Sequence, residues 1–242
     1  MSAGFQCKQF YIAHQHCAMK VGTDALLLGA WAQLPAHGAI LDIGAGSGII
    51  SLMLAQRSQG TLAINAVELD NAAATQATDN VRHSPWPTAI RVIKDDILTY
   101  QTPQRYALIV SNPPFFQDAL ASQEIKRHQA RHTDSLPFRA LLEKAASLLT
   151  AEGVFSLILP AVSQAAFSKA AIASGWSCQR LCAVQSKAEK PVSRYLQSWS
   201  LANVNNQAEM ALQQADSLLI HDANGHYSEQ YRTILKDFYL KF

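Results

Sequence analysis

Cysteine is scarce in this sequence, and its four cysteines are scattered as Cys7, Cys17, Cys178 and Cys182. No two of them have the C-x-x-C spacing that a structural zinc site needs. Scattered thiols in a chain of 242 residues are typical of a reducing compartment. We therefore expect a cytoplasmic protein without a zinc framework.

Long hydrophobic runs and a strong excess of charge are also absent. No apolar stretch approaches the roughly 18 residues of a membrane span, and the N-terminal "MSAGFQCKQFYIAHQH" lacks the apolar core of a signal peptide. The formal net charge is only +2. The sequence thus predicts a soluble protein, on which any nucleic-acid-binding surface is a local patch.

Short apolar runs alternate with helical stretches over most of the chain. The runs expected to form strands are residues 39–43, 62–69, 89–97, 106–112 and 154–160. Alternation of this kind predicts a parallel sheet with helices on both faces. Two later runs, "CQRLCAVQS" and "SRYLQSWSLA", suit an antiparallel pair at the edge of the sheet. We expect a doubly wound α/β fold, Rossmann-like, with seven mostly parallel strands and an antiparallel edge strand.

Helices are expected between these strands. The segment 70–83 begins with Asp70, a good N-cap residue, and the segment 136–153 is expected to be a helix closed by Gly153. Another helix is expected over 161–174, and a last one in the tail "YSEQYRTILKDFYLKF". We expect a single domain, 1–242, divided into an N-terminal extension (1–36), a cofactor-binding core with a catalytic loop (37–160) and a C-terminal half (161–242).

The stretch "LDIGAGSGII" places Gly44, Gly46 and Gly48 between the first core strand and its helix. Loops at the carboxyl ends of parallel strands bind ligands, and glycine lets the backbone approach them closely. The spacing is G-x-G-x-G, so the dinucleotide pattern G-x-G-x-x-G is not met. A lone glycine loop can equally be a tight turn, but Glu68 ends the next strand 20 residues after Gly48. A carboxylate there can bind both hydroxyls of a ribose.

The third strand ends in "KDDI". An acid here can accept a hydrogen bond from the exocyclic amine of an adenine. Asp96 is the better candidate because it lies next to the apolar Ile97 and Leu98, although Asp95 remains an alternative and both can be loop charges.

The fourth strand ends in the rigid stretch "SNPPFF". Taken together, "LDIGAGSG", "VELD", "DDI" and "SNPPF" resemble the class I S-adenosylmethionine-dependent methyltransferases, and N-P-P-F resembles their amino-methyltransferase subclass. The resemblance implies the cofactor S-adenosyl-L-methionine, with S-adenosyl-L-homocysteine as its product. It implies the catalytic residues Asn112, Pro113, Pro114 and Phe115, and the cofactor-binding residues Asp42, Gly44, Gly46, Gly48, Glu68, Asp96, Asn112 and Thr23.

Stretches near the two ends of the chain resemble a narrower group within these methyltransferases. The stretches "QFYIAHQHCAMKVGTDALLLGAWA", "KPVSRYLQSWS" and "YSEQYRTILKDFYL" resemble the bacterial tRNA1(Val) adenine-N6 methyltransferases. This resemblance implies a tRNA substrate, methylated at N6 of the adenosine next to the anticodon, position 37. Lys20, Thr23 and Asp24 can then approach the methionine end of the cofactor, although Thr23 is equally a helix N-cap and the cap is the better interpretation. "KPVSR" departs from the family, which is richer in proline in this stretch.

Two basic segments are candidates for RNA contact, since RNA binding needs positive charge and stacking surfaces. The candidate residues are Lys126, Arg127, Arg131, Lys190 and Arg194, and the alternative is two solvated charged loops. His128 and His132 have the spacing of a metal pair on a helix, but no third ligand follows, so we expect no metal. His14 and His16 fall in a terminus that we expect to be mobile, and no role is assigned to them.

Three other functions remain open. A protein glutamine methyltransferase shares the chemistry, but that subclass usually carries Tyr at the position of Phe115. A nicotinamide-dependent oxidoreductase shares the fold, but no hydride-transfer set of residues is evident. A non-catalytic cofactor-binding scaffold would not need the N-P-P-F stretch. We expect a monomer or a weak dimer without membrane association.

Overall fold

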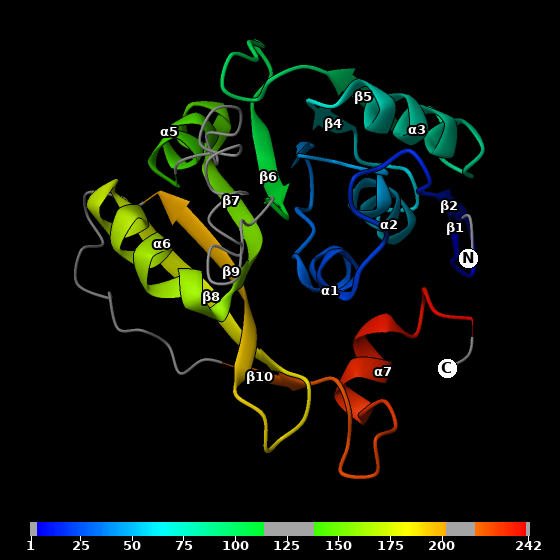
Figure 1. Ribbon diagram of the computed structural model, residues 1–242. Coiled ribbons are helices and arrows are strands. Elements are labelled where there is room, and N and C mark those ends of the chain that lie inside the picture. The colour runs from blue at the N-terminus through cyan, green and yellow to red at the C-terminus, as the bar shows by residue number, and fades with distance from the viewer. Residues whose placement is uncertain (1–3, 114–137, 202–215, 241–242) are drawn as a thin grey trace, which may run out of the picture.

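The computed structural model describes residues 4–113, 138–201 and 216–240. Within these ranges the main sheet has eight strands in the order β10-β8-β9-β7-β6-β3-β4-β5 (Figure 1). The strands are β3 (Ala39–Ile43), β4 (Ile64–Glu68), β5 (Ile90–Lys94), β6 (Tyr106–Ser111), β7 (Leu149–Pro160), β8 (Trp176–Gln185), β9 (Val192–Leu201) and β10 (Asp216–Leu219). A separate antiparallel pair, β1 (Gly4–Gln6) and β2 (Tyr11–Ala13), precedes them.

Helices cover both faces of the main sheet, as the alternating sequence predicts. Figure 1 shows α1 (Thr23–Trp31), α2 (Ile49–Arg57) and α3 (Asn71–Arg82) on one side, and α5 (Phe138–Leu148) and α6 (Ala161–Ala173) on the other. The C-terminal helix α7 (Glu229–Leu235) joins the core on the first side. Each face of the sheet has its own hydrophobic core, and side chains of successive strand residues point to opposite faces. In β6, Leu108 and Val110 pack into one core and Ile109 packs into the other. This arrangement confirms the doubly wound α/β fold.

The strand count and the edge of the sheet differ from the prediction. The sheet has eight strands rather than seven, because β10 pairs in parallel with β8. β9 is antiparallel to both of its neighbours, β7 and β8, so the predicted antiparallel pair is present. The antiparallel strand therefore lies inside the sheet, and β10 forms the edge. In the described ranges, no helix is long and apolar enough to cross a membrane.

The boundary between α5 and β7 also differs from the prediction. The helix ends at Leu148, and β7 begins at Leu149, so Gly153 lies inside a strand and does not close a helix. The register between β6 and β7 shifts here, and a Cβ added to Gly153 would lie 2.9 Å from the carbonyl oxygen of Tyr106. Glycine is therefore required at this position by the close approach of two strands.

The sheet has its switch point between β3 and β6. From β3 the chain continues outward to β4 and β5, and it then returns to place β6 on the other side of β3. Ligands of open α/β sheets bind beyond the carboxyl ends of the strands at such a point. The residues that follow β3, β4, β5 and β6 are therefore the candidates for ligand binding.

Candidate functional site

The glycine loop after β3 forms an open backbone cradle. Gly44, Gly46 and Gly48 all have positive φ angles, of 71°, 55° and 81°. An ideal Cβ at Gly44 or Gly46 would meet no described atom within 4 Å beyond its chain neighbours, so no described residue packs against the backbone at these two positions. Gly48 is the N-cap residue of α2, and the N-terminal end of a helix carries partial positive charge. Gly44 is exposed and Gly46 is half-buried, so this part of the loop is open to a ligand among the described residues.

Asp42 lies beneath this loop and is completely buried. Its Oδ2 accepts hydrogen bonds from the backbone N–H of Ser51 at 3.1 Å and from the Ser51 hydroxyl at 2.7 Å. Its Oδ1 has no hydrogen-bond partner among the described residues. Burial raises the pKa of this carboxyl to about 7, against the two hydrogen bonds from Ser51, which lower it. A buried carboxylate oxygen without a partner beside an open cradle fits a site that receives a polar or cationic group.

Glu68 links the loops that follow β3 and β4. Its Oε2 accepts the backbone N–H of Gly46 at 2.7 Å, and its Oε1 accepts that of Asp70 at 2.8 Å. Asp70 in turn accepts the N–H of Ala73 and caps α3, which confirms the predicted cap. The strand-end carboxylate therefore lies against the glycine loop, where the sequence places it.

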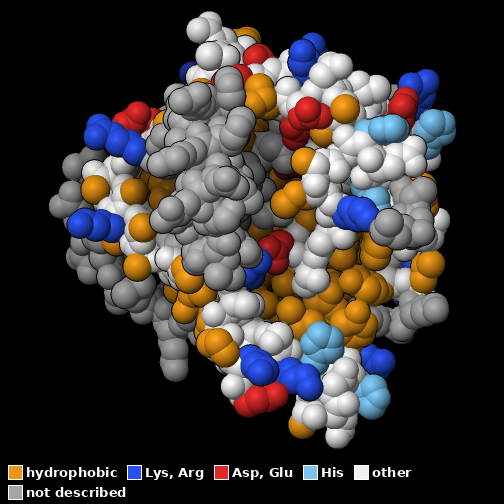
Figure 2. All heavy atoms as spheres, viewed as in Figure 1, with side chains coloured by type: hydrophobic (Ala, Val, Ile, Leu, Met, Phe, Trp, Pro, Cys, Tyr) orange, Lys and Arg blue, Asp and Glu red, His pale blue; other side chains and the backbone are white. Residues whose placement is uncertain are grey.

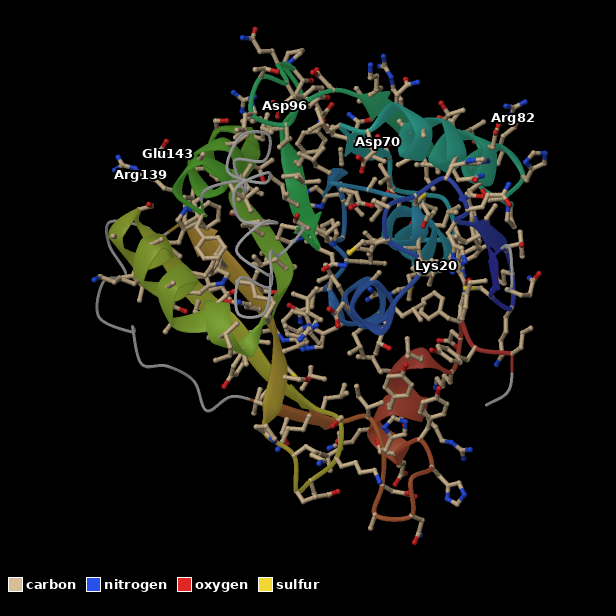
Figure 3. All side chains as sticks on the ribbon, in the orientation of Figure 1. Lys20, Asp70, Arg82, Asp96, Arg139 and Glu143 are labelled. Atoms are coloured by element: carbon tan, nitrogen blue, oxygen red, sulfur yellow. The ribbon has the colours of Figure 1, made fainter. Side chains whose placement is uncertain are left out.

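Two half-buried carboxylates, those of Asp95 and Asp96, follow the end of β5. Asp70 and Asp96 follow the carboxyl ends of the neighbouring strands β4 and β5 (Figure 3). Asp95 Oδ1 accepts the N–H of Asp96, and Asp96 Oδ1 accepts the N–H of Leu98. Each acid therefore keeps a second oxygen that these bonds do not use. Asp95 and Asp96, the two predicted acceptors for an adenine amine, therefore both lie at this edge of the sheet, and both have an oxygen that could accept.

Two exposed leucines lie at this edge, and of these Leu69 was not predicted from the sequence. Leu69 follows Glu68 and is 66% exposed, and Leu98 follows the Asp96 turn and is 41% exposed. A large apolar side chain left in water directly after a strand-end acid is a signal that sequence analysis can use. These side chains present apolar surface that a flat ring can cover.

Asn112 and Pro113 lie at the end of β6. Asn112 is half-buried and Pro113 is buried. The hydroxyl of the preceding Ser111 donates to the carbonyl of Ile43 at 3.0 Å, which ties the end of β6 to the start of the glycine loop. Figure 2 shows a hollow near the centre of the view, where β6 ends in Figure 1. The other predicted catalytic residues, Pro114 and Phe115, lie outside the described residues, as do Lys126, Arg127, His128, Arg131 and His132.

The start of α1 differs from the prediction. The N-cap residue is Gly22, with no side-chain cap hydrogen bond, so Thr23 is the first helical residue and not the cap. Burial raises the pKa of Tyr231 on α7, and a side-chain hydrogen bond with Thr23 acts in the opposite direction. The Thr23 side chain is therefore near α7.

Arg194 and Lys190, both predicted to contact RNA, have different surroundings. Arg194 Nε lies 2.8 Å from Asp24 Oδ2, and both side chains are 30% exposed. This ion pair joins the start of β9 to the first turn of α1. Lys190 is exposed in the connection between β8 and β9, where its carbonyl accepts the side chain of Gln185. Across the described part of the chain, no group of three or more metal-ligating side chains occurs.

The comparisons with known proteins agree with this geometry. The model of the methyltransferase small domain family matches residues 15–167. A tRNA1(Val) (adenine(37)-N6)-methyltransferase of Dickeya chrysanthemi is 46% identical over 241 residues, which cover 99% of this chain and 95% of that protein.

Solved structures share the fold at low sequence identity. A predicted O-methyltransferase of Agrobacterium tumefaciens superposes with a TM-score of 0.65 at 16% identity, over 89% of this chain and 96% of that one. The glycopeptide N-methyltransferase MtfA, solved with S-adenosyl-L-methionine, superposes with a TM-score of 0.55 at 12% identity, over 74% of this chain and 94% of that one.

Proposed function

Because the chain belongs to the methyltransferase small domain family, we propose that it is a tRNA (adenine-N6)-methyltransferase. It transfers the methyl group of S-adenosyl-L-methionine to N6 of adenosine 37 in tRNA1(Val). The observation that carries the proposal is the position of Asn112. It directly follows β6, whose last residue, Ser111, is hydrogen-bonded to Ile43 at the start of the glycine loop. The chain is also 46% identical to a tRNA1(Val) (adenine(37)-N6)-methyltransferase over nearly its whole length.

Different residues at the carboxyl edge of the sheet would bind the amino-acid, ribose and adenine portions of the cofactor. Gly44 and Gly46 give its amino-acid portion a backbone surface without side chains. Glu68 would hold the ribose hydroxyls, because two of the roughly four acceptor positions of a carboxylate remain after its bonds to Gly46 and Asp70. Asp95 or Asp96 would accept from the adenine amine, and Leu69 and Leu98 would cover the adenine ring.

The chemistry needs positioning more than a base. The cofactor supplies an electrophilic methyl group on a sulfonium. The adenine amine is a weak nucleophile because its lone pair is delocalised into the ring. The side-chain carbonyl of Asn112 and the backbone carbonyl of Pro113 accept its two hydrogens, which favours a more pyramidal and more reactive nitrogen. Prolines hold these acceptors in place before the substrate arrives, and the amine loses its proton after attack.

For the tRNA, we expect Phe115 to stack on the target base once the base has left its stack, and Lys126, Arg127 and Arg131 to bind backbone phosphates. Lys190, which is exposed on the connection between β8 and β9, adds positive charge, and Arg194 follows it on β9. The cytoplasm, where tRNA is modified, is the compartment that this function implies.

The test is methyl transfer from labelled S-adenosylmethionine to an unmodified tRNA1(Val) transcript. The matched control is the same transcript with guanosine at position 37, and a release-factor-like protein and duplex DNA are assayed in parallel. We expect N6-methyladenosine only in the first transcript, identified by mass spectrometry of its nucleosides. Label in the control transcript, in protein or in DNA would overturn the proposed substrate. Stabilisation by NAD but not by S-adenosylhomocysteine would overturn the reaction class.

A further inference from the structure

The side chain of Asn80 on α3 joins the last residue of β2, Ala13, to the glycine loop. Asn80 Oδ1 accepts the N–H of Ala13 at 3.0 Å, and Nδ2 donates to the carbonyl of Ala13 at 2.8 Å. The same Nδ2 donates to the carbonyl of Ser47, in the middle of the glycine loop, at 2.9 Å. Asn80 is only 4% exposed, so these three bonds are made away from water. Residues 13–22, which we call the N-terminal strap, thus share a buried anchor with the cradle.

A second side chain organises the strap from within. His14 Nδ1 accepts the N–H of Val21 at 3.2 Å, and the His14 carbonyl accepts the N–H of Cys17 at 3.4 Å. His14 is only 7% exposed. The expectation of a mobile terminus is therefore wrong for His14, because its ring is enclosed and draws the strap into a compact loop.

The strap lies beside the part of the site that holds Glu68. Burial raises the pKa of the Cys17 thiol to about 11, and the negative charges of Glu68 and Asp70 act in the same direction, so this strap residue lies within electrostatic reach of both carboxylates. Figure 1 shows the chain between β2 and α1 crossing in front of α2, and Lys20 of the strap is labelled there in Figure 3. The strap then continues into α1, whose Asp24 pairs with Arg194.

Helix α3 supports the glycine loop at two successive turns. A Cβ on Gly48 would lie 3.4 Å from the Cβ of Ala77, so the loop rests on this helix. Three residues later, Asn80 holds Ser47 and Ala13 together. Only an amide offers an acceptor and two donors at this length, which the Ala13 N–H and the two carbonyls require. A carboxylate at position 80 would face both carbonyls without a proton.

From this arrangement we propose that Asn80 is a positioning residue for the cofactor. It couples the N-terminal strap to the glycine loop, so that the strap forms one wall of the cofactor site. The proposal rests on the proposed function, since it assumes that the glycine loop binds S-adenosylmethionine. It goes beyond that function in assigning the strap and Asn80 to cofactor affinity, and not to the methyl transfer step.

Calorimetric titration of the full chain with S-adenosylhomocysteine tests the proposal, together with kcat at saturating cofactor. Asn80→Ala is expected to raise the Kd by about tenfold or more, because it removes three buried hydrogen bonds, and to leave kcat within about twofold. The matched control is Gln76→Ala, on the same helix and 8% exposed, which is expected to bind as the wild type does. An unchanged Kd for Asn80→Ala, or equal losses in both variants, would overturn the proposal.

A second pair of variants covers the case in which Asn80→Ala does not fold. His14→Phe removes the acceptor of the Val21 N–H without touching α3, and His14→Asn keeps an acceptor near the position of Nδ1. We expect a raised Kd for the first and recovery in the second. Equal, wild-type affinity in both would contradict the role of the strap. Failure of the wild type itself to bind S-adenosylhomocysteine would instead contradict the cofactor assignment on which the proposal depends.

Discussion

Glu68 and Gly46 are 22 residues apart in the chain and are joined by a hydrogen bond of 2.7 Å from the Gly46 N–H to Glu68 Oε2. The other oxygen accepts the N–H of Asp70, so the carboxylate holds the turns after β3 and β4 together. Hydrogen bonds from N–H groups to an ionised carboxylate are stronger than those between neutral groups. The residue proposed to bind the ribose therefore also fixes the loop against which the cofactor lies.

Replacement of Glu68 tests this double role. Glu68→Gln keeps the length of the side chain but turns one acceptor oxygen into a donor, which then faces the N–H of Gly46 or Asp70. We expect the Kd for S-adenosylhomocysteine to rise by roughly 10-fold to 100-fold, since both the loop and the ribose lose a charged acceptor. Glu143→Gln is the control, because Glu143 is an exposed acid on α5 that pairs only with the exposed Arg139 in the described structure. Equal affinity in the two variants would refute the role of Glu68.

Asn112 is among both the catalytic and the cofactor-binding residues that the resemblance implies, and we expect its replacement to affect turnover far more than cofactor affinity. Asn112→Ala removes the side-chain acceptor for the amine, and we expect kcat to fall by about a hundredfold or more. The Kd for S-adenosylhomocysteine should stay within about twofold, because the glycine loop and Glu68 are untouched. Asn112→Asp keeps an acceptor oxygen and should lose less activity than Asn112→Ala. Single-turnover rates of methyl transfer to tRNA at saturating cofactor compare the two variants with the wild type. A near-normal rate for Asn112→Ala would exclude the acceptor role.

The core strands were predictable because they are continuous buried runs between turn residues. β3 matches its predicted bounds, and α3 lies within its predicted range with Asp70 as its cap. The start of β7 was not predictable, because "LTAEG" has helix-forming residues and only the approach of Gly153 to Tyr106 reveals a strand. The four-residue β10 was missed because its pairing with β8 comes from far along the chain.

The same contrast holds for the site. The glycines, Glu68 and the acids after β5 were predictable because each directly follows a strand, and parallel strands end at one edge. The role of Asn80 could not be predicted, since in the sequence it is an ordinary polar residue of a helix. Its partners Ala13 and Ser47 are 67 and 33 residues away. The pair of Asp24 with Arg194 spans 170 residues, and no local pattern indicates it.

That pair gives separate predictions for the two basic residues near β9. Arg194→Gln is expected to lower the free energy of unfolding, with a coupling to Asp24→Asn of at most about 1 kcal/mol because both side chains are partly exposed. Lys190→Gln should leave stability unchanged, weaken tRNA binding and reduce the salt slope of log K by about 1. A double-mutant cycle in denaturant and filter binding of tRNA at several salt concentrations measure these effects. A coupling of zero would show that the ion pair adds nothing to stability.

Asp42 gives the protein a pH dependence of stability whose sign follows from its burial. The pKa of Asp42 is raised from 3.8 to about 7, so the folded chain holds this proton over a pH range in which the unfolded chain has released it. The resulting stabilisation is complete below about pH 4 and is lost as the pH rises toward about 7. Asp42→Asn resembles the protonated form and does not titrate. We therefore expect the stability of the variant, relative to the wild type, to increase with pH across this window, by an amount on the order of a few kcal/mol in total.

Denaturant unfolding of the two proteins without cofactor, at a series of pH values, measures this difference. The other titrating groups are shared, so those that do not interact with Asp42 cancel in the comparison. Ser51→Ala is an informative third protein, because it removes the hydroxyl that lowers the pKa of Asp42 and should move the upper end of the window to higher pH. A difference between Asp42→Asn and wild type that stays constant with pH would show that Asp42 does not titrate in this range.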